Sequence, residues 1–489
     1  MRIKSLLVPF IFGLVGIFSF SPFSIKLLIF FSYSYLIYII LYEEKSVFLK
    51  IFSWGAGHWG FGMSWIIVSV YYYGETTIAL SLLIYALLVI ILSFVFTSPL
   101  FLIRTILNKI VINKDLYVIL LISSFLIVSE FSRYYLLNGV PWLIPGNIYL
   151  DTITQNIYPL FGVSTASFLI YILCSYFVIS YYKNKKFFIP ILLIVFFAIP
   201  QHKKAIEFED GINVSIIQPS SDPFLKYEGN YHKTIETNLI NLIASASDAS
   251  KIVVLPEAEL PYSIKSKDFD NFINKIPDKD KIIMGVWDRE ENLTYNSIYS
   301  LKFNDSSYKK MHLVPFGEYI PFISSLRGLV GFFDLPMSNV TKGPLNQKNI
   351  KAINNINIAS PICFDIAFSN TVRKMNKSSL LMINISNDTW FGNSIGPYHH
   401  LSIARIRAIE NNKWTIRATN DGISAIIDNN GTIVNKLEKG ISGILEGKIR
   451  LIDKNSFYNN YGYLFSYIMS FIIIFISFIS YLWKKFTLN

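Results

Sequence analysis

Three reactive side chains stand beside short apolar runs in the polar part of the chain. Glu257 and Cys363 each follow a run rich in β-branched residues, and Lys310 precedes the stretch His312–Glu318. A carboxylate, an ammonium group and a thiol supply a base, a cation and a nucleophile, which acyl transfer through a thioester requires. We therefore predict that Cys363 attacks an ester carbonyl, that Glu257 takes the proton, and that Lys310 stabilises the oxyanion.

Each of these residues also has a purely structural interpretation. Cys363 would then be an inert buried thiol, Glu257 a surface carboxylate in a turn, and Lys310 a solvated lysine beside Lys309. Glu318 either orients the ammonium group and the base or forms a structural salt bridge. The surrounding motifs and the spatial arrangement decide between these interpretations.

The composition indicates an integral membrane protein. Of the 489 residues, 52% are hydrophobic, and the mean hydropathy is +0.42. Few soluble proteins of this size are so apolar. The apolar residues form long runs, and a spanning helix needs about 17–25 residues. We predict eight spans, at 5–20, 25–42, 51–73, 78–101, 116–133, 160–182, 187–200 and 463–482, of which the first and seventh are short.

The positive charges predict the orientation of these spans. With both termini in the cytoplasm, twelve Lys and Arg residues fall on the cytoplasmic side, and two, Lys26 and Arg133, fall in short loops on the other side. We predict a transmembrane domain at 1–200, a catalytic domain at 201–462 in the periplasm of a bacterium, and a last span with a cytoplasmic tail at 463–489. Most of the net charge of +11 lies in the membrane part, so it gives no indication of nucleic-acid binding.

The polar domain alternates between strand-like and helix-like segments. This pattern predicts a layered α/β domain, with Glu257 and Cys363 at strand ends on one rim. An Asn430-Gly431 pair predicts a hairpin turn. We expect strands at 212–217, 251–255, 282–287, 297–303, 356–362, 380–385, 414–418 and 423–434, and helices at 230–247 and 397–410.

The cysteines and histidines indicate neither a disulfide nor a metal site. Cys174 lies in a predicted span and Cys363 in the polar domain, so we expect no bridge between them. The six histidines have no metal-ligand spacing, and no glycine-rich loop indicates a nucleotide. We predict that the protein needs no metal and no cofactor.

Two segments have a structural and a functional interpretation each. Phe322–Met337 is apolar, and is either a core loop or a mobile arm in the lipid interface that guides an acyl chain. The glycine-rich run Trp54–Trp65 either permits close helix packing or forms a lipid-facing groove near the site.

Several motifs resemble those of one family. The chain resembles the apolipoprotein N-acyltransferases, bacterial inner-membrane enzymes, over nearly its whole length, most specifically at His312–Pro321 (HLVPFGEYIP) and Ser386–Gly392 (SNDTWFG). The resemblance implies a nitrilase-like α-β-β-α domain inserted into a membrane domain of eight helices. It also implies a Glu-Lys-Cys triad at Glu257, Lys310 and Cys363, with Glu318 as a supporting acid. Further similar stretches are Trp54–Trp65, Pro141-Trp142-Leu143, Leu255–Glu259 and Arg417–Gly422.

The resemblance also implies a reaction in two steps. Cys363 takes an acyl chain from a phospholipid and becomes a thioester, and a lysophospholipid leaves. The α-amine of a diacylglyceryl-cysteine at a lipoprotein's N-terminus then attacks the thioester. The partners implied are a phospholipid donor, a lipoprotein acceptor and the membrane, with no cofactor, and we expect a monomer.

The chain departs from the family pattern beside the thiol and at one aromatic position. The family commonly has Cys-Tyr-Glu where this chain has Cys363-Phe364-Asp365, and often a Trp where Tyr227 stands. The resemblance gives Phe364 and Asp365 a supporting role, and gives Tyr227 and Trp390 a role in substrate binding. The departures bear on the geometry beside the thiol and on the substrate range.

Two other functions compete with acyl transfer. A membrane-tethered amidase would use the same triad on a small periplasmic amide, but such a substrate needs no lipid access. A transporter or scaffold with an inactive domain would be favoured by ionisable residues deep in the spans, and the sequence has few. Turnover of a small amide, compared with acyl loss from phospholipid, distinguishes the enzymes.

Overall fold

The computed structural model describes two compact units of the chain. They are named here the helical unit (Met1–Ile67, Ile78–His202 and Tyr461–Asn489) and the sheet unit (Val68–Thr77 and Lys203–Asn460). Tyr227 and Phe322–Met337, both singled out above, lie outside the described residues. The described residues are 4–72, 74, 76–109, 115–201, 203–204, 208–222, 225, 228–303, 306–315, 317–319 and 339–487.

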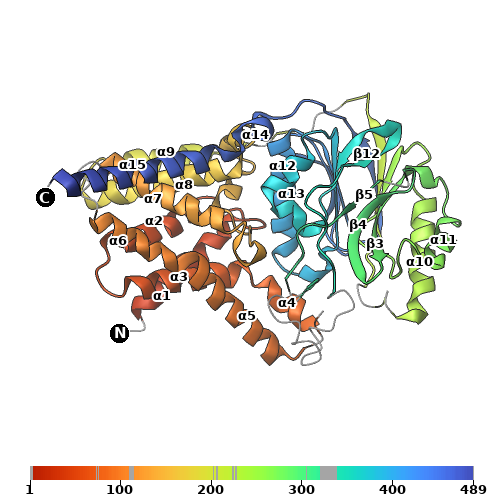
Figure 1. The fold of residues 1–489 in the computed structure, drawn as a ribbon, viewed down its shortest axis with the longest axis horizontal. Coiled ribbons are helices and arrows are strands. Elements are labelled where there is room, and N and C mark those ends of the chain that lie inside the picture. The colour runs from red at the N-terminus through yellow and green to blue at the C-terminus, as the bar shows by residue number, and fades with distance from the viewer. Residues whose placement is uncertain are drawn as a thin grey trace. The chain divides into compact units, whose positions relative to one another are not determined.

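The helical unit is built of helices (Figure 1). Four of its described segments are long and apolar enough to cross a membrane, at Ile78–Asn108, Asp115–Ser132, Ile153–Tyr182 and Gly462–Trp483. Three shorter apolar segments lie at Lys4–Ser19, Leu28–Tyr42 and Phe188–Phe197. The predicted number of eight spans stays a prediction. The helices are α1 (Lys4–Val15), α2 (Leu28–Tyr42), α3 (Val47–Gly62), α4 (Trp65–Tyr72, which continues into the sheet unit), α5 (Ile78–Leu92), α6 (Phe101–Lys109), α7 (Asp115–Ser132), α8 (Tyr158–Tyr182), α9 (Phe188–Phe197) and α15 (Phe465–Thr487).

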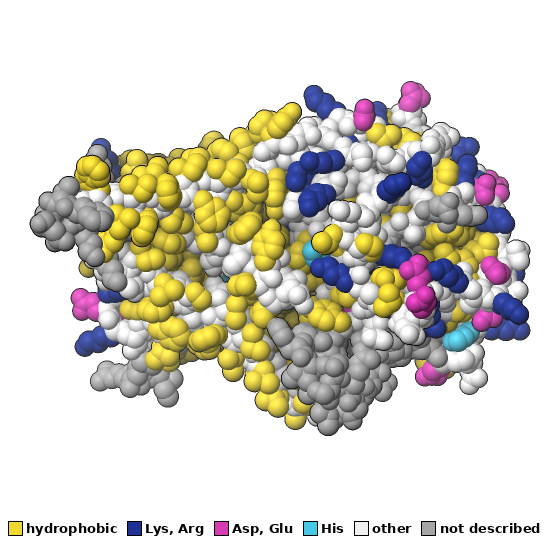
Figure 2. All heavy atoms as spheres, in the orientation of Figure 1, with side chains coloured by type: hydrophobic (Ala, Val, Ile, Leu, Met, Phe, Trp, Pro, Cys, Tyr) yellow, Lys and Arg dark blue, Asp and Glu magenta, His cyan; other side chains and the backbone are white. Residues whose placement is uncertain are grey.

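The surface of the helical unit suits a lipid environment. On the face drawn in Figure 2, hydrophobic side chains cover its helices, whereas most charged side chains lie on the sheet unit. Large apolar side chains such as Leu83 on α5 and Phe475 on α15 are more than half exposed. Because such exposure is unfavourable in water and favourable in hydrocarbon, this unit is a membrane domain.

The segment 51–73, predicted as one span, is not one continuous helix. The helix α3 ends at Gly62, and a new helix, α4, begins at Trp65. Met63 between them has φ −110° and ψ 14°, which is outside the helical region. The run Trp54–Trp65 contains no proline and no Asp, Glu, Lys or Arg, so the hydropathy of the sequence does not reveal the break.

The glycines of α3 confirm the packing interpretation of the Trp54–Trp65 run. A Cβ on Gly57 would lie 2.0 Å from the carbonyl oxygen of Phe10, and a Cβ on Gly13 would lie 2.0 Å from that of Trp54. The backbones of α1 and α3 therefore touch at positions that only glycine permits.

The sheet unit is an α-β-β-α sandwich, as predicted. Two six-stranded sheets have the strand orders β12-β1-β2-β3-β4-β5 and β11-β10-β9-β8-β7-β6. In each sheet the central strands are parallel and the outer ones antiparallel. The helices α10 (Gly229–Ala244) and α11 (Lys267–Ile273) cover one sheet, and α12 (Ser369–Met375) and α13 (Gly396–Asn411) cover the other (Figure 1). A short helix, α14 (Phe457–Asn460), ends the unit. The strands are β1 (Ile212–Gln218), β2 (Ile252–Val254), β3 (Ile282–Glu290), β4 (Leu293–Ser300), β5 (Ser307–Lys309), β6 (Ile350–Lys351), β7 (Asn357–Ala359), β8 (Leu381–Ser386), β9 (Thr415–Thr419), β10 (Ser424–Ile427), β11 (Ile433–Leu437) and β12 (Gly443–Ile449).

Local sequence explains where these elements start and stop. Ser266 caps α11 by accepting a hydrogen bond from the Phe269 amide at 3.2 Å. Asn412, with φ +56°, ends α13 in a left-handed conformation that asparagine tolerates. Gly431, with φ +78°, closes the predicted hairpin between β10 and β11. Apolar residues of α10, α11 and strands β1–β3 form a buried core beneath the first sheet.

Candidate active site

Glu257 lies directly after β2, where the chain turns beside β3. The Leu255 amide still donates to the Ile283 carbonyl at 2.9 Å, and the Gly285 amide donates to the Pro256 carbonyl at 3.1 Å. A Cβ on Gly285 would lie 2.6 Å from the Glu257 Cα. The missing side chain of Gly285 therefore lets the turn pack against β3 and sets the position of Glu257.

The carboxylate of Glu257 is buried and fully engaged. Its Oε1 accepts hydrogen bonds from Lys310 Nζ at 3.0 Å and from Asn296 Nδ2 at 2.7 Å. Its Oε2 accepts from the Asn387 amide at 2.8 Å. These donors fix the orientation of the carboxylate at the strand end, as a positioned general base requires.

Lys310 follows β5 and forms a bridge between two acids. Its side chain is 1% exposed, and Nζ donates to Glu257 Oε1 at 3.0 Å and to Glu318 Oε1 at 2.8 Å. Burial alone would lower the pKa of the Lys310 ammonium, but the charges of Glu257 and Glu318 hold that pKa well above its ordinary value. Lys310 is therefore a charged ammonium group in a buried site.

Glu318 is the second acid that contacts Lys310. Its Oε1 also accepts from Asn296 Nδ2 at 3.1 Å, and its Oε2 accepts from the Val314 amide at 2.8 Å. The contact with Lys310 is an ion pair that fits both interpretations made from the sequence, so the role of Glu318 as a supporting acid stays a prediction. The carboxylate has donors on both oxygens, so these contacts fix its orientation.

Cys363 stands at the point where the chain leaves β7 and enters a short 3₁₀ turn. Its φ of +45° is uncommon for a residue with a side chain and indicates local strain of the kind found at active sites. The thiol lies within electrostatic range of Glu257 and Lys310. Burial raises the pKa of this thiol, Glu257 raises it further, and Lys310 opposes both. The resting group is therefore a neutral thiol that needs a base.

A buried charged cluster supports the backbone of Cys363. His400 Nε2 donates to the Cys363 carbonyl at 3.2 Å, and its Nδ1 lies 2.9 Å from Asp388 Oδ1. Arg417 pairs with the other oxygen of Asp388 and also contacts Asn384. Burial alone would raise the pKa of Asp388, but Arg417 and His400 hold it well below its ordinary value. The strained nucleophile is thereby tied to β8, β9 and α13.

Asp365 connects the nucleophile turn to the segment that carries Lys310. It accepts from the Tyr308 hydroxyl at 3.0 Å, from the His312 amide at 2.8 Å and from the Ile362 amide at 3.3 Å. Burial raises the pKa of Asp365 to about 7, against the opposing effect of Lys310. Phe364 is half-buried, and its ring packs edge-on against Phe368 at 5.2 Å.

Trp390 lies in the turn after β8, close to the start of α13. Its side chain is half-buried, and its carbonyl accepts from the Ser69 hydroxyl at 2.7 Å. A Cβ on the neighbouring Gly392 would lie 2.5 Å from Val68 Cγ1. Val68 and Ser69 therefore pack against the SNDTWFG turn within the sheet unit. The role of Trp390 in substrate binding stays a prediction.

The structure thus brings Glu257, Lys310, Glu318 and Cys363 into one buried neighbourhood. The sequence interpretation missed Asn296, which binds both carboxylates through its side chain and the Lys310 amide through its carbonyl at 2.8 Å. It also missed His400, which lies on α13, the helix that follows the SNDTWFG motif. The proximity of that histidine to a motif beside the thiol was the available signal.

Comparison with known proteins identifies two regions. Residues 213–454 match the carbon-nitrogen hydrolase family, and residues 12–176 match the N-terminal domain of apolipoprotein N-acyltransferase. The apolipoprotein N-acyltransferase of Haemophilus influenzae is 30% identical, with 95% of this chain and 92% of that protein covered. The enzyme of Haemophilus ducreyi is 29% identical, with 96% of this chain and 95% of that protein covered. The enzyme of Vibrio parahaemolyticus is 30% identical, with 94% of this chain and 94% of that protein covered.

A solved structure gives a weaker similarity. A CN-hydrolase superfamily protein from Xanthomonas campestris covers 49% of this chain and 91% of its own, with 16% identity and a TM-score of 0.37. That similarity is too low to support an inference about this chain.

Proposed function

The chain belongs to the apolipoprotein N-acyltransferase family and is an N-acyltransferase, and from this premise we propose the donor, the intermediate and the residues of its reaction. The acyl donor is a membrane phospholipid such as phosphatidylethanolamine. The acceptor is the α-amine of an N-terminal diacylglyceryl-cysteine. The acyl group passes through a thioester on Cys363, and no cofactor is needed because the donor ester is already activated.

One observation carries this proposal. The ammonium group of Lys310 lies 3.0 Å from Glu257 and 2.8 Å from Glu318, in the buried neighbourhood of the Cys363 thiol. A neutral thiol beside an ionised carboxylate and a fixed cation is the arrangement that nucleophilic acyl transfer uses.

The first half-reaction follows from these positions. The Cys363 sulfur attacks the ester carbonyl while Glu257 takes the thiol proton, and Lys310 stabilises the resulting oxyanion. The tetrahedral intermediate then collapses. Glu257 returns the proton to the departing oxygen of the lysophospholipid, and an S-acyl Cys363 remains.

The second half-reaction uses the same groups. The lipoprotein amine attacks the thioester carbonyl, and Lys310 again stabilises the oxyanion. Glu257 takes a proton from the amine and gives it to the departing Cys363 sulfur. The amide product and the free thiol complete the cycle with no net change in the enzyme.

We also propose the placement of the protein in the cell. It spans the inner membrane of a bacterium eight times as a monomer, with domains at 1–200, 201–462 and 463–489. Both termini are cytoplasmic and the catalytic domain is periplasmic. The twelve-to-two distribution of Lys and Arg across the membrane supports this orientation. Alkaline-phosphatase fusions after residues 200 and 487 test it, since only the first should be active.

Paired cysteine variants test the catalytic assignment. Cys363→Ser should remain folded in the membrane and lose N-acylation of a diacylglyceryl lipopeptide. Cys174→Ser is the matched control, because Cys174 is the other free cysteine, is also buried and lies in the helical unit. It should retain activity. Full N-acylation by the Cys363→Ser variant would exclude the thioester route.

A further inference from the structure

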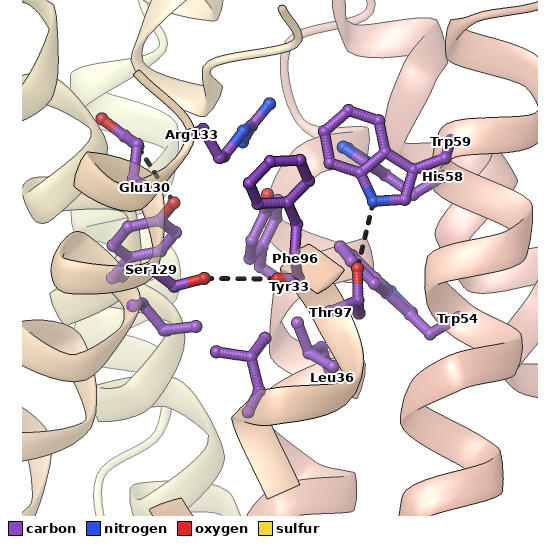
Figure 3. Close-up of a pocket in the computed structure, with 13 residues that line it drawn as sticks. Tyr33, Leu36, Trp54, His58, Trp59, Phe96, Thr97, Ser129, Glu130 and Arg133 are labelled. Atoms are coloured by element: carbon purple, nitrogen blue, oxygen red, sulfur yellow. Dashed lines mark hydrogen bonds between the residues drawn. The ribbon is translucent and has the colours of Figure 1, made fainter. Parts of the chain in front are cut away.

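The helical unit contains a cavity that the proposed acyl transfer does not use. It lies between α2, α3, α7, α8 and the π-helical turn Ser93–Thr97, and its volume is about 30 Å³ (Figure 3). Its walls combine aromatic rings with ionisable and hydroxyl groups. The lining residues used below are Tyr33, Trp54, His58, Trp59, Glu130 and Arg133.

The glycine-rich run of α3 builds one wall of this cavity. Gly57 packs α3 against α1, while Trp54, His58 and Trp59 line the cavity. Two hydrogen bonds hold the indoles, from Trp54 Nε1 to the Ser32 carbonyl and from Trp59 Nε1 to Thr97 Oγ1, each 3.1 Å long. The ring of His58 stacks on that of Trp54 at 5.0 Å. The wall is therefore rigid.

Polar atoms at this cavity lack partners among the described residues. They are both ring nitrogens of His58, Oε1 of Glu130 and Nε of Arg133. These residues are 1%, 1% and 5% exposed. Away from water, each unpaired polar atom destabilises the fold, and hydrocarbon offers no replacement partner. Buried polar groups that lie around one cavity without protein partners therefore require a polar molecule that binds in the cavity.

The charges of the wall exclude an ionic guest. A cation would face the guanidinium of Arg133, and an anion would face the carboxylate of Glu130. The aromatic face that would attract a cation is already used by the protein, because Arg133 Cζ lies 4.7 Å from the ring centre of Trp59. The guest must therefore be neutral, and it must both donate to Glu130 and accept from Arg133.

The size of the cavity then selects the guest. A water molecule needs roughly 10–15 Å³ of cavity volume. The cavity of about 30 Å³ therefore has room for about two water molecules. We propose that this cavity is a water site inside the membrane domain, in which about two water molecules link Glu130, Arg133 and His58. The site connects α3 with α7, and it is independent of the acyl-transfer chemistry.

Hydroxyl-radical footprinting of the full-length protein in lipid nanodiscs tests this site. Radicals formed by radiolysis of H₂¹⁸O oxidise a buried ring only where bound water touches it. Trp59 and Tyr33 should incorporate ¹⁸O several-fold faster than Tyr158. Tyr158 is the matched control because it is also fully buried in the helical unit, and its hydroxyl donates to the Gly146 carbonyl at 2.7 Å. Equal labelling of all three rings would overturn the proposal.

Two variants make the test specific. Glu130→Gln keeps a neutral acceptor and should retain the labelling of Trp59. His58→Phe removes two polar atoms and fills space, so it should reduce the labelling of Trp59 to that of Tyr158. Labelling that changes when choline replaces sodium, or when the lipid head group is changed, would indicate an ion or a lipid in the cavity and would overturn the proposal.

Discussion

Gly285 is expected to control the activity of this enzyme although it has no side chain. A Cβ at this position would lie 2.5 Å from the Ala258 nitrogen, 2.6 Å from the Glu257 Cα and 2.6 Å from the Pro256 oxygen. Non-bonded carbon atoms normally stay about 3.5–4.0 Å apart. All three neighbours are backbone atoms, so no side-chain rotation relieves the contact. The Gly285→Ala variant must therefore move the Glu257 turn or β3 by about 1 Å.

Such a displacement acts on chemistry more than on stability. Overpacking of this kind costs about 1–3 kcal/mol of unfolding free energy, whereas a displacement of about 1 Å at a catalytic group costs about 10²-fold in rate. We expect Gly285→Ala to form the acyl-enzyme about 10²-fold more slowly in single-turnover experiments with excess phospholipid. Its thermal unfolding should still be cooperative.

Gly229→Ala is the matched control for this experiment. Gly229 opens α10 in the same unit, and a Cβ there would meet no atom within 4 Å. It should keep the wild-type rate. A wild-type acylation rate in Gly285→Ala would show that the position of Glu257 does not limit the reaction, and this would refute the role given to the Glu257 turn.

The contacts around the site give three further predictions. Glu318→Gln places an amide NH₂ opposite a donor and removes a negative charge beside Lys310, so it should cost about 1–3 kcal/mol of stability. Because the lost charge lowers the pKa of Lys310, the alkaline limb of the rate–pH profile should shift to lower pH. An unshifted limb would contradict this. His400→Phe removes the hydrogen bond to the Cys363 carbonyl and should lower kcat about tenfold with KM unchanged, whereas a rise in KM alone would assign His400 to substrate binding instead. The pKa of Asp365 is raised in the folded protein, so this carboxyl ionises at lower pH in the unfolded chain, and stability should fall as pH rises from 3.8 to about 7. Asp365→Asn should flatten that part of the plot of stability against pH. An unchanged slope would show that Asp365 is already ionised in the folded protein.

Strand positions in the sheet unit were predictable where most residues of a short run are apolar. The runs 212–217 and 380–385 match β1 (Ile212–Gln218) and β8 (Leu381–Ser386) within one residue. The prediction for β4 was displaced, because the strand covers Leu293–Ser300 and not 297–303. Its register is set by antiparallel pairing with β3, from Glu290 opposite Leu293 to Ile283 opposite Ser300, and partner choice is not a local property.

The site was predictable as far as residue chemistry goes. The residue types alone were enough to select Cys363, Lys310 and Glu257, because a thiol, an amine and a carboxylate each stand beside a strand-like run. Asn296 could not be selected by its type. Its side-chain amide reaches two carboxylates only because β4 lies beside the segment after β5. The support given by His400 to Cys363 likewise arises only when α13 packs on the second sheet.

Mass spectrometry of Cys363 tests the central claim most directly. The purified enzyme is incubated with phospholipid alone, digested, and read at the peptide that contains Cys363. An acyl adduct there should appear at one equivalent, disappear with hydroxylamine or an added diacylglyceryl lipopeptide, and be absent from the peptide of Cys174. An enzyme that N-acylates the lipopeptide from phospholipid while Cys363 never carries an acyl group would contradict the account.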